Sequence, residues 1–146
     1  MFRISRRLDY GLQLMIALAQ ESDNRAKATA VLAEQLSIPL PFLHQIGRSL
    51  IQGRLIKATP GPHGGLRLNN SPEEITLLQI VETLEGPICI SPNLDSSTGD
   101  EPCMTDPVWG ELQSMLVDHL SNIRLNDLAA QPLPVGLIEQ VKVEKE

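Results

Sequence analysis

The residues best suited to chemistry in this chain are its two cysteines, Cys89 and Cys103. Thiolates bind iron, zinc and iron–sulfur clusters, and accessible thiols undergo reversible oxidation. In a reducing compartment such a pair serves as metal ligands or redox sensors more often than as a structural disulfide. Three uses therefore stay open for the two cysteines: ligands of a cluster, a thiol switch or reversible disulfide, and inert packing.

The other side chains do not form the constellations that enzymes use. The three histidines, His44, His63 and His119, are too scattered along the chain for one metal site. The sequence contains no Walker loop, Rossmann fingerprint or Gly-x-Ser-x-Gly elbow. Neither cysteine has a histidine at a spacing suited to nucleophilic catalysis. We therefore expect that the protein is not an enzyme.

A second group of candidate residues lies on one predicted helix that begins at Leu40. Its residues Leu43, Ile46 and Leu50 recur at steps of three and four, so they face a core. The opposite, outward face consists of Pro41, His44, Gln45, Arg48 and Ser49. Amide and guanidinium groups on one helix face can bind base edges and phosphates in the major groove of DNA. The pattern predicts a DNA-reading helix.

A second helix and a hairpin must position this reading helix. In residues 28–36 the apolar residues Val31, Leu32 and Leu36 recur at helical spacing, which predicts a helix with these three residues toward the core. The prolines of the turn 37–41 end that helix. Residues 55–59 and 66–68 then flank the glycine-rich segment 61–65, which suits the tip of a β-hairpin. This order of elements predicts a winged helix-turn-helix, with the hairpin as the wing.

Three further helices are predicted. Ser5 caps a helix that runs to about Gln20, and Asp9 lies off its buried side. That side consists of Leu8, Leu12, Met15, Ile16 and Ala19. Thr76 and Gln79 form a capping box for a helix over 77–85. A long helix begins at Asp106-Pro107 and carries an apolar ridge of Leu112, Met115, Leu116, Leu120 and Ile123. Because this ridge follows a complete winged helix, it indicates a dimer interface.

We therefore predict a mainly α-helical fold with a small β-hairpin wing: a winged helix-turn-helix followed by a long C-terminal dimerisation helix. The predicted DNA-binding domain spans residues 1–86. A flexible sensor loop that bears the cysteines spans 87–104, a dimerisation helix region spans 105–130, and a disordered tail spans 131–146.

The charge of the chain is unevenly divided. The whole sequence of 146 residues has a formal net charge of −6. Up to Arg67, nine Lys and Arg against four Asp and Glu give +5, and the rest of the chain gives −11. The basic part coincides with the predicted reading helix and wing, as phosphate binding requires, and argues against a winged helix used only for protein contacts. No apolar run is long enough for a membrane span or a signal peptide, so we expect a cytoplasmic protein.

Several short motifs together resemble the Rrf2 family of winged-helix transcriptional regulators. They are Ile4-Ser5 with Tyr10, Ala33-Glu34, Ile38-Pro39 with Phe42-Leu43, the wing segment 61–65, Ile75-Thr76-Leu77, and Cys103 with Asp106 and Trp109. The resemblance covers roughly residues 1 to 130. It implies homodimers that bind partly palindromic operators in double-stranded DNA. The residues expected to contact DNA are Arg3, Ser5, Pro41, Phe42, His44, Gln45, Arg48, Gly61, His63 and Arg67.

The resemblance also implies a sensor site. Cluster-bearing members carry three cysteines before the long helix, and one type adds a histidine after the last cysteine. Cys89 and Cys103 match the first and last cysteines, the middle one is absent, and Asp106 stands at the histidine position. Some relatives recruit an acidic residue from the first helix of the other subunit, which Asp9 matches. The resemblance thus implies an iron–sulfur cluster of the 2Fe–2S type with Cys89, Cys103, Asp106 and Asp9 as ligands.

Alternatives to the cluster stay open. Asp106 precedes a proline, so its carboxylate can serve as the N-cap of the long helix by accepting from the amides of residues 108 and 109. Asp9 can act simply as a favourable anion in the first turn of its helix. We predict a homodimeric transcriptional repressor that senses iron–sulfur or redox status. The alternative is a cluster-free regulator of the same fold, switched by cysteine oxidation or by a partner protein.

Overall fold

Helices and one antiparallel hairpin form the described part of the chain, which comprises residues 3–90 and 104–130 of a computed structural model. The elements in chain order are α1 (Arg6–Ala19), the short 3-10 helix η1 (Ser22–Asn24), α2 (Thr29–Leu36), α3 (Leu40–Gln52), β1 (Ile56–Thr59), β2 (Gly65–Leu68), α4 (Leu77–Glu85), α5 (Asp106–Asn122) and α6 (Leu125–Ala130). This arrangement confirms the predicted fold class. Cys103 and the predicted tail 131–146 lie outside the described residues.

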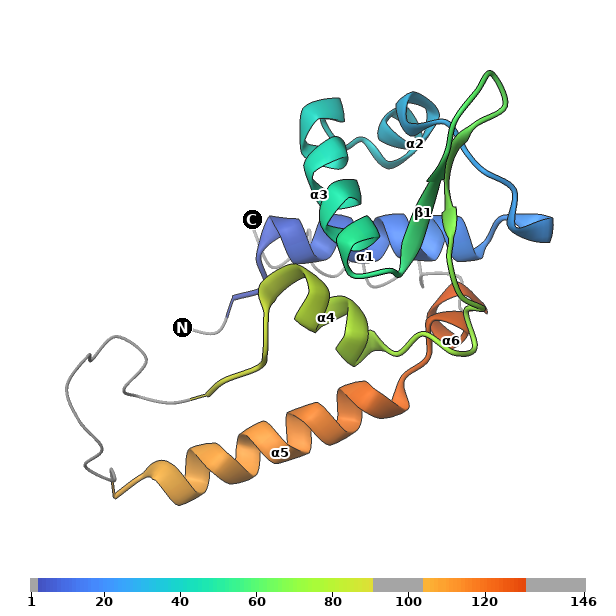
Figure 1. The fold of residues 1–146 in the computed structure, drawn as a ribbon. Coiled ribbons are helices and arrows are strands. Elements are labelled where there is room, and N and C mark those ends of the chain that lie inside the picture. Colours follow the sequence, from blue (N-terminus) through green and yellow to red (C-terminus); the bar gives the residue numbers. More distant parts are fainter. Residues whose placement is uncertain (1–2, 91–103, 131–146) are drawn as a thin grey trace, which may run out of the picture.

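Helix α1 runs through the centre of the winged helix (Figure 1). Ser5 caps it as predicted, because its side-chain oxygen accepts from the amide of Leu8 at 3.1 Å. The buried side of α1 is wider than the predicted stripe, since Leu14 and Leu18 are also almost fully buried. The reason is that α1 packs against α3 and α4 and also against β2 and α6. A helix enclosed on several sides buries more than one stripe.

Helices α2 and α3 form the helix-turn-helix. Ser37 ends α2 with a left-handed backbone at φ 55°, and the amide of Ile38 donates to the carbonyl of Ala33 at 3.0 Å. The prediction that Val31 faces the core was wrong, because its side chain is 49% exposed whereas Leu32 is fully buried. Adjacent residues on a helix point about 100° apart, and in α2 the core side falls on Leu32 and Ala33.

The wing is the hairpin of β1 and β2, with Lys57 opposite Arg67 and Thr59 opposite Gly65. The chain before α2 extends this sheet, because Lys27 and Leu66 exchange two backbone hydrogen bonds of 2.9 Å. Gly65 has φ +150°, and a Cβ there would lie 2.0 Å from the carbonyl oxygen of Lys27. Glycine at this position therefore lets the wing lie against the segment that leads into α2.

Helix α4 has the predicted bounds and the predicted capping box of Thr76 and Gln79. The region 105–130 forms two helices, α5 and α6. The chain leaves the helical conformation at Ile123, whose carbonyl accepts from the amide of Leu77 at 2.9 Å. Leu125 is fully buried and begins α6, which packs on α1. Through Leu125, helix α6 therefore packs on the winged helix-turn-helix domain. Helix α5 extends beside α4 (Figure 1).

None of the described helices has both the length and the apolar composition needed to cross a bilayer.

Candidate nucleic-acid interface and sensor segment

The outward face of α3 carries the side chains that the sequence predicted for DNA reading. Pro41, His44, Gln45 and Arg48 are all exposed, while Leu43, Ile46 and Leu50 on the other side are fully buried. Phe42 is different, because its ring is partly buried and meets Tyr10 edge to face at 5.6 Å between centroids. Phe42 therefore joins α3 to α1, and the four exposed residues form the reading face.

The amino end of α1 is tied to both α3 and α4. The side chain of Arg7 donates from Nε to the carbonyl oxygen of Leu84 at 3.1 Å and from Nη2 to Oγ of Ser49 at 2.5 Å. The hydroxyl of Ser5 donates to the carboxylate of Glu85 and also caps α1. Ser5, expected to contact DNA, is thus engaged within the chain. We call the group of Ser5, Arg7, Ser49 and Glu85 the helix junction.

Arg7 was not among the residues singled out from the sequence. Its partners Ser49 and Leu84 are far away along the chain, so no local pattern marks it. The carbonyl of Leu84 belongs to the last turn of α4, where carbonyls lack partners within the helix. A guanidinium there satisfies such a group and interacts favourably with the helix dipole.

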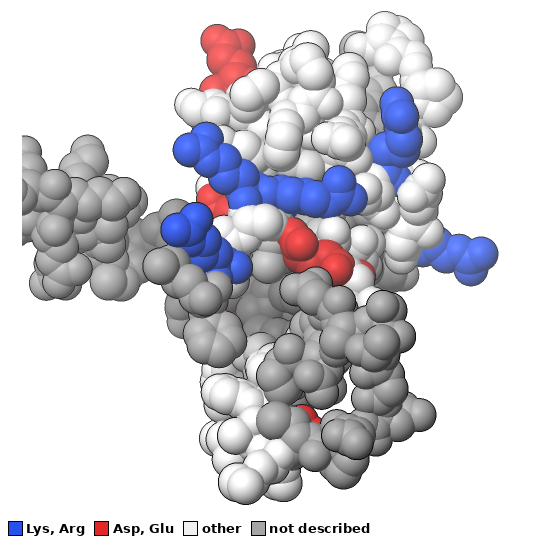
Figure 2. All heavy atoms as spheres, turned by 90° about the vertical axis from the view of Figure 1, so that its left-hand side faces the viewer, with Lys and Arg blue, Asp and Glu red and all other residues white. Residues whose placement is uncertain are grey.

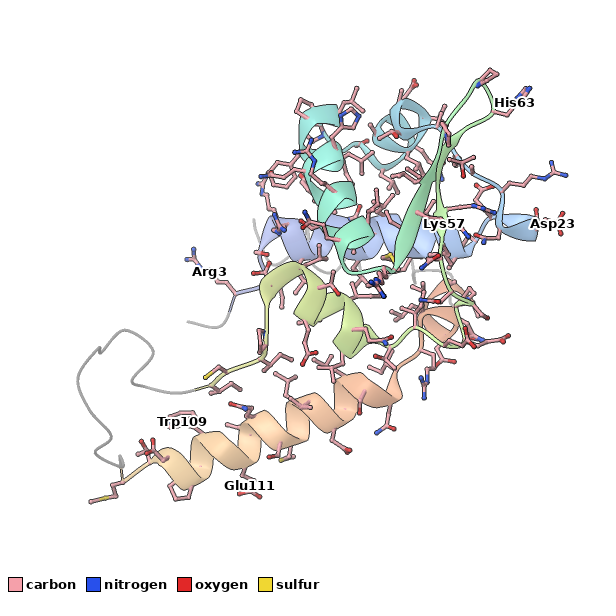
Figure 3. All side chains as sticks on the ribbon, viewed as in Figure 1. Arg3, Asp23, Lys57, His63, Trp109 and Glu111 are labelled. Carbon is pink, nitrogen blue, oxygen red and sulfur yellow. The ribbon has the colours of Figure 1, made fainter. Side chains whose placement is uncertain are left out.

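Basic side chains gather on the side of the molecule that presents α3 and the amino end of α1. Figure 2 shows Lys and Arg side chains reaching across this side, with Asp and Glu above and below them. Arg3 lies just before α1 and projects from this end of the molecule (Figure 3). On the wing, Gly61 and His63 are exposed at the tip, whereas Arg67 is half-buried on β2. The predicted DNA contacts are therefore spread over α3, the chain before α1 and the wing.

The segment after α4 carries Cys89, whose side chain is exposed. It is attached to α5, because the amide of Ile90 donates to the side-chain oxygen of Gln113 at 2.9 Å. Among residues 3–90 and 104–130, no three His, Cys, Asp or Glu side chains gather around one point suitable for a metal ion. Cys89, Asp9 and Asp106 are therefore not brought together within one chain, and Cys103 lies outside the described residues.

The two aspartates of the predicted sensor site both lie in the first turn of a helix. Asp9 is exposed on the first turn of α1 and accepts from the side-chain amide of Gln13 at 2.8 Å. Asp106 is the first residue of α5, and the N-cap is Thr105. The amides of Val108 and Trp109 donate to the backbone carbonyl of Thr105 at 3.0 and 3.2 Å. The structure thus places the N-cap at Thr105, one residue before the position expected for Asp106.

Helix α5 exposes an apolar stripe along one side. Val108, Leu112, Met115 and Leu116 are 56%, 44%, 63% and 40% exposed. Leu120 and Ile123, at the far end of the predicted ridge, are partly buried within the chain. A contiguous row of large exposed apolar side chains is typical of a protein interface. We call Val108, Leu112, Met115 and Leu116 the α5 stripe.

Comparison with known proteins gives a consistent result. Residues 4–131 match Rrf2, described as an iron-dependent transcriptional regulator. The HTH-type transcriptional regulator CymR of Bacillus subtilis is 30% identical over 128 residues, which cover 88% of this chain and 90% of CymR. The HTH-type transcriptional regulator IscR of Pectobacterium atrosepticum is 25% identical over 128 residues, which cover 86% of this chain and 78% of IscR. The solved structure of CymR, the global cysteine regulator of B. subtilis, has a TM-score of 0.74 at 30% identity and covers 89% of this chain and 98% of that structure.

Proposed function

Because this chain belongs to the Rrf2 family of transcriptional regulators, we propose that it is a homodimeric repressor whose affinity for DNA follows the state of Cys89 and Cys103. The observation that carries the DNA-binding part is the face of α3, where exposed His44, Gln45 and Arg48 stand over a fully buried apolar side. A wing lies beside this helix, as in winged helix-turn-helix proteins that read the major groove. A regulator of this kind acts where the chromosome is, in the cytoplasm.

The α5 stripe supports the homodimer. Its four apolar side chains are exposed in one chain, and a second copy can bury them by placing the same helix against them. A two-fold dimer presents two copies of α3 in opposite directions. The proposed operator is therefore partly palindromic, with half-sites spaced by the distance between the two reading helices.

The position of Cys89 supports a sensing role. It is exposed and lies between the end of α4 and the contact of Ile90 with α5. The end of α4 in turn belongs to the helix junction, which contacts α3 through Arg7 and Ser49. A change at Cys89 that reorders this segment can therefore bias the positions of the two reading helices.

Two forms of sensing are proposed, and the cluster is the first. Cys89 and Cys103 would hold a 2Fe–2S cluster, with Asp106 and the partner subunit's Asp9 as oxygen ligands. Such a cluster would supply redox sensitivity, and oxygen ligands would make it more labile than a set of four thiolates. The similarity to IscR and the family description as iron-dependent favour this form. The second form is a cluster-free thiol switch on the same two cysteines, favoured by the similarity to CymR, the global cysteine regulator.

Anaerobic purification separates the two forms. The protein is supplied with iron and sulfide, and its absorbance, iron and sulfide contents are measured beside its affinity for operator DNA. A coloured protein that loses its colour in both Cys89→Ala and Cys103→Ala, while the dimer stays intact, supports the cluster. Asp106→Asn should then shorten the lifetime of the colour in air if Asp106 is a ligand.

A colourless protein that binds its operator fully under these conditions would overturn the cluster form. The thiol switch then predicts that diamide changes the operator affinity of the wild type and that dithiothreitol restores it. Cys89→Ala should abolish this response. A protein whose operator affinity is the same in all these states would contradict both forms of sensing.

A further inference from the structure

The segment that follows α4 has one side turned toward the protein. Ile88 and Ile90 are partly buried, whereas Pro87 and Cys89 are exposed. Burial that alternates from one residue to the next is typical of extended backbone, in which successive side chains point to opposite sides. Cys89 is therefore an outward residue of a segment whose inward side is formed by two isoleucines.

A hydrogen bond attaches this segment to α5. The amide of Ile90 donates to the side-chain oxygen of Gln113 at 2.9 Å, and the bond is part-buried. Gln113 lies midway along α5 and is itself partly buried. A backbone amide that is withdrawn from water needs an acceptor, and here a side chain of another element supplies it. The bond thus fixes the backbone next to Cys89 to one position on α5.

Trp109 lies one turn before Gln113, on the same side of α5. It is partly buried, and it rises from α5 toward the segment after α4, whereas Glu111 lies on the opposite side of the helix (Figure 3). The sequence contains one tryptophan, so the fluorescence of the protein reports on this side of α5. We call Ile90, Trp109 and Gln113 the α5 anchor.

Helix α5 is held less firmly by its own chain than the other long helices. None of its residues is buried, whereas α1 and α3 each bury several. Its carboxyl end is fixed, because the carbonyl of Ile123 accepts from the amide of Leu77 at 2.9 Å. An element with few buried side chains shifts more readily than the core. The orientation of the rest of α5 therefore depends on contacts such as the α5 anchor.

The α5 anchor and the α5 stripe occupy adjoining sides of the same helix. Gln113 directly follows Leu112 and lies about one turn before Leu116, and both leucines belong to the stripe. A helix moves as a unit, so a tilt of α5 that follows release of the anchor also displaces the stripe. In a two-fold dimer the same displacement occurs in both copies.

We propose that Gln113 is a positioning residue that couples the state of Cys89 to the homodimer through the α5 anchor. This rests on the proposed function, because it names the way in which the sensor site acts on the dimer. A group attached to Cys89 stands next to the bonded amide of Ile90, and its bulk disfavours the docked course of the segment. Release of that amide loosens α5 and weakens the packing of one stripe on the other.

The test attaches N-ethylmaleimide to Cys89 in the full chain with Cys103→Ser. In this background Cys89 is the one cysteine that reacts, and no cluster with two thiolate ligands can form. The dissociation constant of the dimer is measured by analytical ultracentrifugation. The emission maximum of Trp109 is measured on the same samples, because indole emission moves to longer wavelength when the ring becomes exposed to water.

Three variants in this background isolate the bond. Gln113→Met removes the acceptor and keeps a side chain of similar size. Gln113→Glu keeps an oxygen acceptor for the amide of Ile90. Ser114→Met is the matched control, because it places the same methionine at the next, exposed position of α5.

Labelling should weaken the dimer several-fold and move the emission of Trp109 to longer wavelength in the background protein and in Ser114→Met. Gln113→Met should show a comparable loss without the label. Labelling should then add little, because both changes release the same contact and their effects are not additive. Gln113→Glu should respond to the label as the background protein does.

The proposal is overturned if labelling changes neither the dimer nor the emission, if labelling acts equally strongly in Gln113→Met, or if Ser114→Met acts like Gln113→Met. A wild type that stays monomeric at every concentration would refute the homodimer of the proposed function and this coupling with it. A stable dimer that responds to neither the label nor Gln113→Met would refute the coupling alone.

Discussion

The helix junction should contribute measurably to stability, and Arg7 is the residue that tests it. Arg7→Ala removes two hydrogen bonds from a charged donor, one to Leu84 at the end of α4 and one to Ser49 on α3. Both bonds are part-buried. Hydrogen bonds to charged groups contribute about 1.5–3 kcal/mol when well buried, so partial exposure lowers the expected total for the two bonds to about 1–3 kcal/mol.

Ser49→Ala should cost less, about 0.5–1.5 kcal/mol, because it removes only one of the two bonds. In a double-mutant cycle, Arg7→Ala and Ser49→Ala should therefore cost less together than the sum of their separate costs. The matched control is Arg6→Ala, since Arg6 is the exposed neighbour with the same charge, and its effect should stay within about 0.5 kcal/mol. The free energy of unfolding is measured by urea denaturation at one protomer concentration, because a dimer's stability depends on concentration. Equal losses for the Arg6 and Arg7 variants, or strict additivity of the Arg7 and Ser49 variants, would refute the reasoning.

Three further predictions concern the interfaces. Arg48→Ala should weaken binding to every duplex and lower the slope of affinity against salt by about one, because one phosphate contact is lost; an unchanged slope would contradict this role. Gln45→Ala should cost roughly 1–3 kcal/mol of binding free energy on the preferred operator and little on random DNA, because a glutamine amide can read adenine. Fluorescence anisotropy measures both affinities. Equal losses of affinity on both DNAs would show that Gln45 is not a reader. Leu116→Lys should give monomers or aggregates in analytical ultracentrifugation, because a charge would be buried in the α5 stripe. The control Ser114→Lys on the same helix should stay dimeric. A dimer of Leu116→Lys with wild-type mass would rule out the interface.

The sequence predicted correctly those features that depend on residues a few positions apart. The bounds of α4 follow from the reciprocal hydrogen bonds of Thr76 and Gln79 and from Gly86 after its last turn. The reading face of α3 follows from the spacing of Leu43, Ile46 and Leu50 alone. These features depend on residues a few positions apart, and one sequence contains all of that information.

Contacts between distant segments were not predictable in the same way. The exposure of Val31 and the burial of Leu14 depend on which neighbours surround α2 and α1. The break between α5 and α6 depends on the bonds of Ile123 and Leu125 with the start of α4. A ridge read along one helix cannot show that its last apolar residues, Leu120 and Ile123, are partly buried by other segments of the same chain. The periodicity of 112–123 therefore predicted one continuous ridge, whereas part of it faces inward.

In the candidate site, too, local patterns were predictable from the sequence, and contacts between distant segments were not. The polar residues of α3 were recognised from their spacing, but the contacts of Arg7 arise only when the amino end of α1, the end of α4 and Ser49 of α3 come together. Asp106 was assigned as a possible cap from the Asp-Pro pair, and the chain begins α5 one residue earlier than that role needs. A shift of one position decides this assignment, and helix ends are the features least well defined by sequence.

If Cys89 senses a signal as proposed, the helix junction offers a route from the end of α4 to the reading helix. Cys89 follows the last turn of α4 closely, and the carbonyl of Leu84 in that turn has Arg7 as its donor. Arg7 also holds Ser49, whose hydroxyl donates to the carbonyl of Gln45 on the reading helix at 3.3 Å. Any rearrangement that withdraws the Leu84 carbonyl would leave Arg7 with one partner and loosen α3 relative to α1. Because a packed interface favours discrete arrangements over gradual deformation, such a loss would shift the population between two orientations of α3. The coupling between Cys89 and operator affinity should therefore weaken in Ser49→Ala even though that variant leaves Cys89 intact, and operator titrations of oxidised and reduced protein measure it directly. An unchanged ratio of the two affinities in Ser49→Ala would place the coupling outside the helix junction.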